Sequence, residues 1–229
     1  MTLRAADAGA QQRFGIEPLQ LMEVAGWQVA RLTDAFLGGI RGKRVIVMAG
    51  SGNNGGDGLV AARFLHQRGA IVTASIVPAR DPASPAARHA ATLRSLGVPL
   101  VEAPTGIDAD AEVIVDGLLG TGIRPPLRDP APRIIAAMNA TGRPIVAVDV
   151  PSGMDADSGA GAESAVRATA TVTLAAPKPG LLSTVNAGRV FLADIGMPAS
   201  LFMADGEAIA ALYRMGDLVE LLKAEITPS

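Results

Sequence analysis

The chain has 229 residues, of which 49% are hydrophobic and 18% are charged, so it is long and apolar enough to bury the core of one large α/β domain. The formal net charge of −2 and the scattered basic residues exclude an electrostatic stripe for nucleic acid or for an anionic membrane surface. The chain has no cysteine, which excludes disulfides, zinc-thiolate sites, iron-sulfur clusters and thiol nucleophiles.

The amino-terminal segment lacks the basic start and the long apolar core of a signal peptide, and no window of the sequence approaches the roughly twenty apolar residues of a membrane span. We therefore expect a cytoplasmic protein with no membrane partner and no nucleic-acid partner.

The first predicted helix follows Pro18 and ends before Gly38 and Gly39, because apolar residues recur at near-helical spacing as far as Phe36. Within it, Met22 is expected in the core. Gly26 indicates close packing against a neighbouring element.

Short apolar runs rich in valine and isoleucine follow, as is typical of strands covered on both faces. They are Val45–Met48, Ile71–Val77, Val113–Val115, Ile145–Val148, Ala170–Leu174 and Val190–Leu192. The helix-compatible segments between them are Asp57–Gln67, Pro85–Leu96 and Pro130–Asn139. This alternation predicts an α/β fold, a Rossmann-like three-layer αβα sandwich with a mostly parallel doubly wound sheet, as one domain over residues 1–229.

Polar loops follow four of these strands, at the carboxyl ends where such folds bind ligands. The loops are Gly50–Asp57, Asp116–Gly122, Asp149–Gly153 and Pro177–Gly180. We expect all four to face one crevice.

The loop Gly50–Gly55 matches the dinucleotide fingerprint G-x-G-x-x-G, which raises the possibility of a dehydrogenase. However, the second strand is followed by Arg80 and not by the acid that would hold the ribose. Arg80 can serve a 2′-phosphate, although a solvated arginine is the favoured interpretation. Asp57 opposes a phosphate at the helix start and is itself a good N-cap, whereas the tandem Asn53 and Asn54 exceed what a turn requires.

Asp116 and Asp149 each follow a strand directly, and Ser152 lies close behind Asp149. Together with the two asparagines they form a set of hard oxygen ligands that suits a Group I or Group II cation, and the carboxylates can also move protons.

Serine hydrolysis is disfavoured because Pro151-Ser-Gly153 is not a nucleophile elbow. His66 and His89 are expected on helix surfaces. Lys178 is either a solvated loop lysine or a phosphate partner.

The four loops together resemble the NAD(P)H-hydrate epimerases, the YjeF N-terminal domain family. The matching stretches are Gly50-Ser-Gly-Asn-Asn-Gly-Gly-Asp-Gly58, Asp116-Gly-Leu-Leu-Gly-Thr-Gly122, Asp149-Val-Pro-Ser-Gly153 and Ala176-Pro-Lys-Pro-Gly-Leu-Leu182, with Leu21-Met-Glu-Val-Ala-Gly26 as an amino-terminal signature. The resemblance runs over residues 1–200 or so. It implies an isomerase of metabolite repair that epimerises the R and S forms of hydrated NADH and NADPH at the hydroxyl-bearing ring carbon.

The resemblance also implies site residues. The substrate contacts it implies are Asn53, Asn54, Gly55, Gly56, Asp57, Gly120, Thr121, Gly122, Ile123, Arg124, Pro125, Pro126 and Asp149. The residues it implies for a potassium ion are Asn54, Asp116 and Ser152. We take Asp149 as the catalytic carboxylate, because inversion at the hydroxyl carbon needs a group that both gives and takes a proton. The prolines after Gly122 depart from the family pattern, and Arg124 and Arg128 can pair with phosphates, although solvated loop arginines are the favoured interpretation.

Residues 210–229 look like the start of a linker that, in bacterial fused relatives, leads into a kinase-like dehydratase domain. The resemblance further implies a homodimer. The alternatives are a non-catalytic nucleotide- or protein-binding module of the same fold and, third, an NADP-dependent oxidoreductase.

Overall fold

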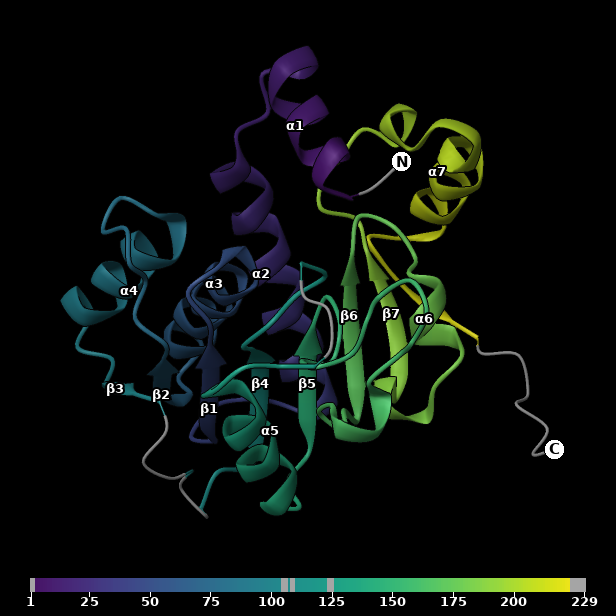
Figure 1. Cartoon of the computed structure of the whole chain (residues 1–229). Coiled ribbons are helices and arrows are strands. Elements are labelled where there is room, and N and C mark those ends of the chain that lie inside the picture. The colour runs from purple at the N-terminus through teal and green to yellow at the C-terminus, as the bar shows by residue number, and fades with distance from the viewer. Residues whose placement is uncertain (1–2, 104–106, 108–109, 123–125, 223–229) are drawn as a thin grey trace, which may run out of the picture.

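The valine- and isoleucine-rich runs form the strands of one continuous sheet in a computed structural model that describes residues 3–103, 107, 110–122 and 126–222 (Figure 1). The strands are β1 (Arg44–Ala49), β2 (Ile71–Ile76), β3 (Leu100–Glu102), β4 (Val113–Gly117), β5 (Ile145–Val148), β6 (Ala170–Leu174), β7 (Arg189–Ala193) and β8 (Leu218–Leu221). Their order is β3-β2-β1-β4-β5-β6-β7-β8. All neighbours pair in parallel except β7 and β8, which are antiparallel.

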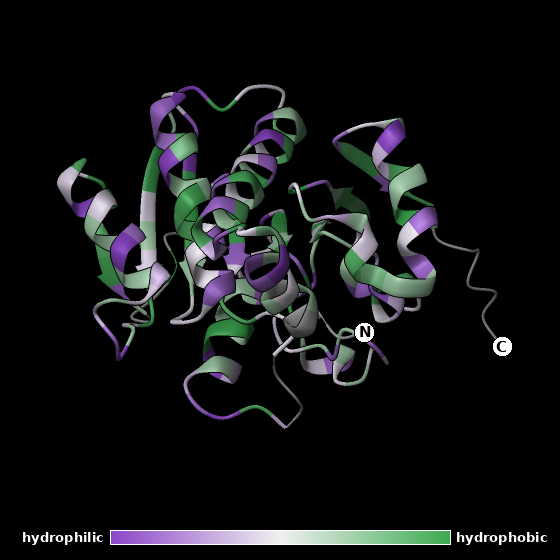
Figure 2. Ribbon diagram, turned by 90° about the horizontal axis from the view of Figure 1, so that it is seen from above, coloured by the Kyte–Doolittle hydropathy of each residue, from purple (hydrophilic) through white to green (hydrophobic). Residues whose placement is uncertain are grey.

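The helices are α1 (Leu3–Phe14), α2 (Pro18–Phe36), α3 (Asn53–Gln67), α4 (Pro85–Ser95), α5 (Ala131–Ala140), α6 (Pro179–Leu182) and α7 (Gly206–Met215). They flank the sheet and carry both hydrophilic and hydrophobic residues, as amphipathic helices on a buried sheet do (Figure 2). The predicted fold class, an αβα sandwich with a mostly parallel doubly wound sheet, is confirmed.

Alternate residues of β1 reach the two faces of the sheet, because successive side chains of a strand point in opposite directions. Val45 and Val47 pack in a core with α2, α3 and α4. Ile46 and Met48 pack in a second core with α5. The strand order reverses between β1 and β4, because β1 is followed by α3 on one face of the sheet and β4 by α5 on the other, and this arrangement leaves a crevice at the carboxyl ends of the two strands.

Helix α2 has the bounds that the sequence predicts, beginning at Pro18 and ending at Phe36. Gly26 allows α2 to touch α3, because a Cβ atom at this position would lie 2.5 Å from the Cβ of Val60. Met22 is 4% exposed. The predicted core position and the predicted close contact are both confirmed.

Elements α1, α7, β3 and β8 were not predicted. Strands β3 and β8 have only 3 and 4 residues and lie at the two edges of the sheet, where a strand is covered less and carries a weaker hydrophobic pattern. Helix α1 is rich in alanine and glutamine and packs against the η3 segment Ala199–Asp205. Residues 210–222, which the sequence suggested as the start of a linker, contribute the end of α7 and all of β8.

No helix in the described part of the chain is both long enough and apolar enough to cross a membrane.

Candidate functional site

A cavity of about 810 Å³ lies at the carboxyl ends of the central strands, within the size range of small-molecule sites in proteins. Its polar lining includes Ser51, Asn53, Asn54, Asp57, Thr121, Arg128, Asp129 and Asp149, and its glycines are Gly50, Gly52, Gly120 and Gly122. Its apolar lining includes Pro18, Leu21, Met22, Ala25, Val77, Leu118, Leu119, Leu174, Ala175 and Ile195. Three of the four predicted polar loops therefore meet in one crevice.

The loop between β1 and α3 is built for close backbone approach. A Cβ atom on Gly50 would lie 1.9 Å from the carbonyl oxygen of Leu118, and a Cβ atom on Gly55 would lie 1.8 Å from the carbonyl oxygen of Gly50. Glycine at position 50 lets the loops after β1 and β4 touch, and glycine at position 55 lets the first turn of α3 lie against Gly50.

Helix α3 begins at Asn53, earlier than predicted, and its N-cap is Gly52. The interpretation of Asp57 as the N-cap is therefore wrong. Asp57 lies inside the helix, is 8% exposed and lines the cavity. The sequence misplaced the boundary because the Asn-Asn-Gly-Gly stretch has a low intrinsic helix propensity.

The predicted substrate contacts fall into three groups. Asn53, Asn54, Asp57, Gly120, Thr121, Gly122 and Asp149 line the cavity. Gly55 and Gly56 are buried in α3, against Gly50 and Met22, and Pro126 is exposed outside the lining. Ile123, Arg124 and Pro125 lie outside the described residues.

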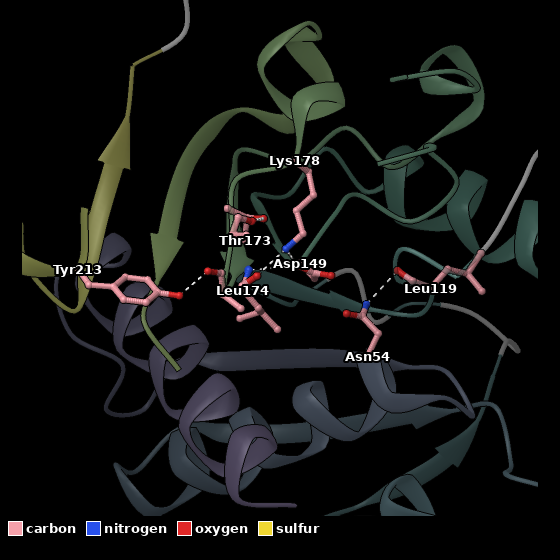
Figure 3. Close-up of polar contacts among 9 residues, drawn as sticks. Asn54, Leu119, Asp149, Thr173, Leu174, Lys178 and Tyr213 are labelled. Atoms are coloured by element: carbon pink, nitrogen blue, oxygen red, sulfur yellow. Dashed lines mark hydrogen bonds and ion pairs between the residues drawn. The ribbon is translucent and has the colours of Figure 1, made fainter. Parts of the chain in front are cut away.

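Asp116, Ser152 and Asn54 form a connected oxygen cluster beside the cavity. The Oγ of Ser152 donates to Oδ1 of Asp116 at 2.6 Å, and the backbone N–H of Ser152 donates to Oδ2 at 2.8 Å. The Nδ2 of Asn54 donates to the carbonyl oxygen of Leu119 at 2.9 Å (Figure 3). The N–H of Leu119 in turn donates to Oγ of Ser152 at 2.8 Å.

The Asp116 carboxyl is completely buried, and no basic side chain within the described residues bonds to it. Burial raises the pKa of Asp116 to about 6, against the opposing hydrogen bonds from Ser152 and Leu118. No group of three or more histidine, cysteine, aspartate or glutamate side chains with metal-site geometry occurs among residues that the structure describes. The side-chain oxygen atoms of Asn54, Asp116 and Ser152 are of the kind that hard Group I and Group II cations prefer as ligands.

Asp149 follows β5 in a left-handed backbone conformation, with a φ of 65°. Its Oδ1 accepts a hydrogen bond from the N–H of Leu174 at 3.0 Å and forms an ion pair with Nζ of Lys178 (Figure 3). The Lys178 side chain is only 3% exposed and is absent from the cavity lining. Neither interpretation of Lys178, as a solvated lysine or as a phosphate partner, is therefore right.

Other predictions had mixed outcomes. Arg80 is exposed and lies outside the cavity lining, whereas Arg128 is exposed and lines it. His66 is half-buried, and the prediction that His89 lies on a helix surface is wrong. His89 is 9% exposed, burial lowers its pKa, and its Nε2 has no hydrogen-bond partner among the residues described.

The apolar wall of the cavity was missed by sequence reasoning. Leu21 and Ala25 of α2 match a helical stripe, which predicts core positions but does not distinguish a core position from a cavity wall. Leu174 and Ala175 also line the cavity, and the hydroxyl of Tyr213 in α7 donates a hydrogen bond to the carbonyl oxygen of Ala175 (Figure 3).

Tyr213 gives a direct test of this wall because it is the only tyrosine of the chain. Burial, together with the charge of Asp194, raises its pKa well above the ordinary 10.0. Ultraviolet titration should therefore show the native phenol ionising at higher pH than the phenol of the urea-unfolded chain. The raised pKa contributes stability that is complete below the unfolded pKa and is lost as pH rises toward the folded one. Coincident native and unfolded titration curves would contradict the buried position, and Tyr213→Phe provides the blank.

Comparison with known proteins gives three findings. A family model described as YjeF-related protein N-terminus matches residues 18–180. A protein of Ajellomyces capsulatus named NAD(P)H-hydrate epimerase is 35% identical over 153 residues, which cover 65% of this chain and 64% of that protein. A protein of Pyrobaculum aerophilum named bifunctional NAD(P)H-hydrate repair enzyme Nnr is 40% identical over 154 residues, covering 63% of this chain and 30% of that protein.

Among solved structures, that of the yeast protein YNL200c is similar with a TM-score of 0.79 and 25% identity, and the match covers 96% of each chain. The matched segment spans less than two thirds of the length of the two curated relatives.

Proposed function

The chain belongs to the family described as YjeF-related protein N-terminus, and we propose that it is an isomerase that interconverts the R and S epimers of hydrated NADH and NADPH. The names of its relatives support this reaction and its role in metabolite repair. The observation that carries the proposal is the cavity itself, in which Asn53, Asn54 and Asp57 meet the Gly120–Gly122 loop and the carboxylate of Asp149.

The chemistry needs no net redox change. The hydroxyl-bearing carbon is bonded to the ring nitrogen. The C–O bond can therefore break while the lone pair of the nitrogen forms a C=N double bond, which gives an iminium cation. The departing hydroxide takes a proton and leaves as water, and a water molecule then adds to the opposite face and returns a proton. One residue that gives and takes this proton serves both steps.

Asp149 fits that role. Its carboxylate lines the cavity, and a negative charge there stabilises the cationic intermediate in a site that is partly shielded from water. Oδ2 accepts no hydrogen bond from any of the described residues, since the bonds to this carboxylate all end on Oδ1. The free oxygen is the one we assign to the proton transfer.

We propose potassium as the cation of the site, held by the side-chain oxygen atoms of Asn54, Asp116 and Ser152. The donor set fits, because a buried carboxylate without a basic partner among the described residues needs a counter-charge, and Oδ1 of Asn54 accepts no bond from the described part of the chain. A bound alkali cation would supply that charge and hold the loops after β1 and β4 together. Because an alkali cation is a poor activator of water, we assign it this structural role and no part in the proton transfer.

Replacing potassium with sodium should therefore lower substrate affinity and the melting temperature together. A ligand at 100 times its Kd stabilises a folded protein by about 2.7 kcal/mol. Differential scanning fluorimetry in matched potassium and sodium buffers measures the shift, and Asp116→Asn should abolish the difference. Equal melting temperatures and equal affinities in the two salts would remove the metal assignment.

One assay tests the proposed reaction. Purified single epimers of hydrated NADH and NADPH are mixed with the chain, and their interconversion is followed by chromatography. Equilibration far above the spontaneous rate supports the epimerase. Binding without interconversion would favour the non-catalytic nucleotide-binding module, and a change in absorbance at the nicotinamide band would favour an oxidoreductase.

We further propose that the chain works in the cytoplasm as a homodimer. Several relatives are named as bifunctional repair enzymes, and the matched part covers only 30% of one of them, which supports the further proposal that this domain occurs fused to a dehydratase domain. Sedimentation velocity at two protein concentrations distinguishes a dimer from a monomer.

A further inference from the structure

Lys178 occupies an unusual position for a lysine. It lies between Pro177 and Pro179 at the start of α6, and its side chain reaches back across the sheet edge to Asp149 at the end of β5 (Figure 3). Its ammonium group donates to Oδ1 of Asp149 and, at 2.6 Å, to the carbonyl oxygen of Leu174.

Burying an ammonium group carries a large desolvation cost, which the attraction to a buried carboxylate offsets only when the geometry is good. A buried ion pair is thus weak ground for a purely stabilising role, because apolar residues of similar volume often do as well. What the pair achieves here is asymmetry in the Asp149 carboxylate.

That asymmetry comes from where the donors lie. The ammonium of Lys178 and the N–H of Leu174 both bond to Oδ1. The ammonium group of Lys178 also donates to the carbonyl oxygen of Leu174, so the two donors to Oδ1 are themselves linked within one turn of the chain. These bonds fix the Asp149 carboxylate relative to Leu174 in the cavity wall. The next residue, Ala175, has a φ of 63°, a left-handed conformation that these bonds help to hold.

The other charged groups near the cavity leave this pairing intact. Asp116 bonds to Ser152, and the other charged residues that line the cavity with Asp149 are Asp57, Arg128 and Asp129. Within the described residues, Lys178 is the cation that bonds to Asp149.

We infer that Lys178 is a positioning residue, which occupies Oδ1 of Asp149 so that Oδ2 is the oxygen presented to the ligand in the cavity. The inference rests on the proposed epimerase function. Because Lys178 is buried behind the carboxylate and does not line the cavity, it acts through Asp149 and not on the substrate.

The test is Lys178→Met, assayed with purified epimers of hydrated NADPH. A misplaced catalytic group costs about 10²-fold in rate, so kcat should fall by that factor while KM stays within about twofold, the signature of an interaction used only in the transition state. In Lys178→Ala, added ethylammonium should restore part of the lost kcat. It should not do so in Asp149→Asn.

The matched control is Lys43→Met, which removes a lysine–carboxylate pair with Glu112 (2.9 Å) at the amino end of β1, away from the cavity. Its kcat and KM should equal those of the wild type. If Lys178→Met does not fold, Lys178→Ala, which also removes both the charge and the hydrogen-bond donor, is held to the same criteria.

The possible results separate the two ideas. An active wild type with an unchanged kcat in the Lys178 variant overturns the inference and leaves the epimerase standing. A raised KM at constant kcat also overturns it, because Lys178 would then contribute to binding. A wild type that does not interconvert the epimers overturns the proposed function and the inference with it.

Discussion

Asp149→Asn is expected to lower kcat for epimer interconversion by about 10² to 10⁴-fold, the range that a positioned general acid–base contributes. Asparagine keeps the size and the hydrogen-bonding capacity of the side chain but can neither take the proton of the returning water nor oppose the cationic intermediate. Substrate binding, measured by calorimetry, should change far less than kcat. A rate near the wild-type value, with folding and affinity intact, would exclude Asp149 from the chemistry.

The variant needs a stability control because it also removes the charge partner of Lys178. Breaking a buried ion pair from one side costs about 3–5 kcal/mol, since an uncompensated charge stays behind. Asp149→Asn should therefore melt lower than the wild type. The double variant Asp149→Asn/Lys178→Met removes both charges and should recover much of that loss without recovering activity, which separates the fold from the chemistry.

The fold was predictable because its signals are local and repeated. Runs such as Val45–Met48 and Ile145–Val148 are short, apolar on every residue and followed by polar loops, which is the pattern of a doubly covered parallel strand. Because parallel strands end at one edge, Asp116 and Asp149 could be placed near each other without any knowledge of their contacts.

The missing parts depend on contacts between segments far apart in the sequence. The ion pair of Asp149 with Lys178 joins residues separated by 29 positions, and the bond from Tyr213 to Ala175 joins residues separated by 38. The pattern around Lys178, a lysine between prolines, is typical of an exposed loop. Lys178 becomes buried only because that loop packs over β5 and β6.

The boundary of α3 is a further case in which tertiary contacts override local propensity. Asn53, Asn54, Gly55 and Gly56 are poor helix formers, yet they form the first turn. The glycines are there for space and not for flexibility, because the turn lies against the backbone of its own preceding loop.

Gly55→Ala should destabilise the chain strongly, even though alanine is the better helix former. The new Cβ would lie 1.8 Å from the carbonyl oxygen of Gly50 and 2.8 Å from its backbone nitrogen. The position of Cβ is fixed by the backbone, and the atoms that it meets are backbone atoms, so no change of rotamer can relieve the contact and the loop must move. Overpacking costs about 1–3 kcal/mol, and at the upper end the melting temperature of a domain of this size falls by roughly 6–12 °C.

Gly58→Ala is the matched control, in the same helix and with the same chemical change. Its Cβ would lie 3.5 Å from Cγ1 of Val47 and 3.6 Å from the Cα of Gly117, which is ordinary van der Waals contact. Removing a glycine from a helix interior gains about 0.5–1 kcal/mol, so this variant should melt at or above the wild-type temperature. The two substitutions must therefore shift the melting temperature in opposite directions if close backbone approach sets the geometry of the loop. Equal shifts for the two variants would mean that helix propensity, and not the contact with Gly50, decides how this loop is built.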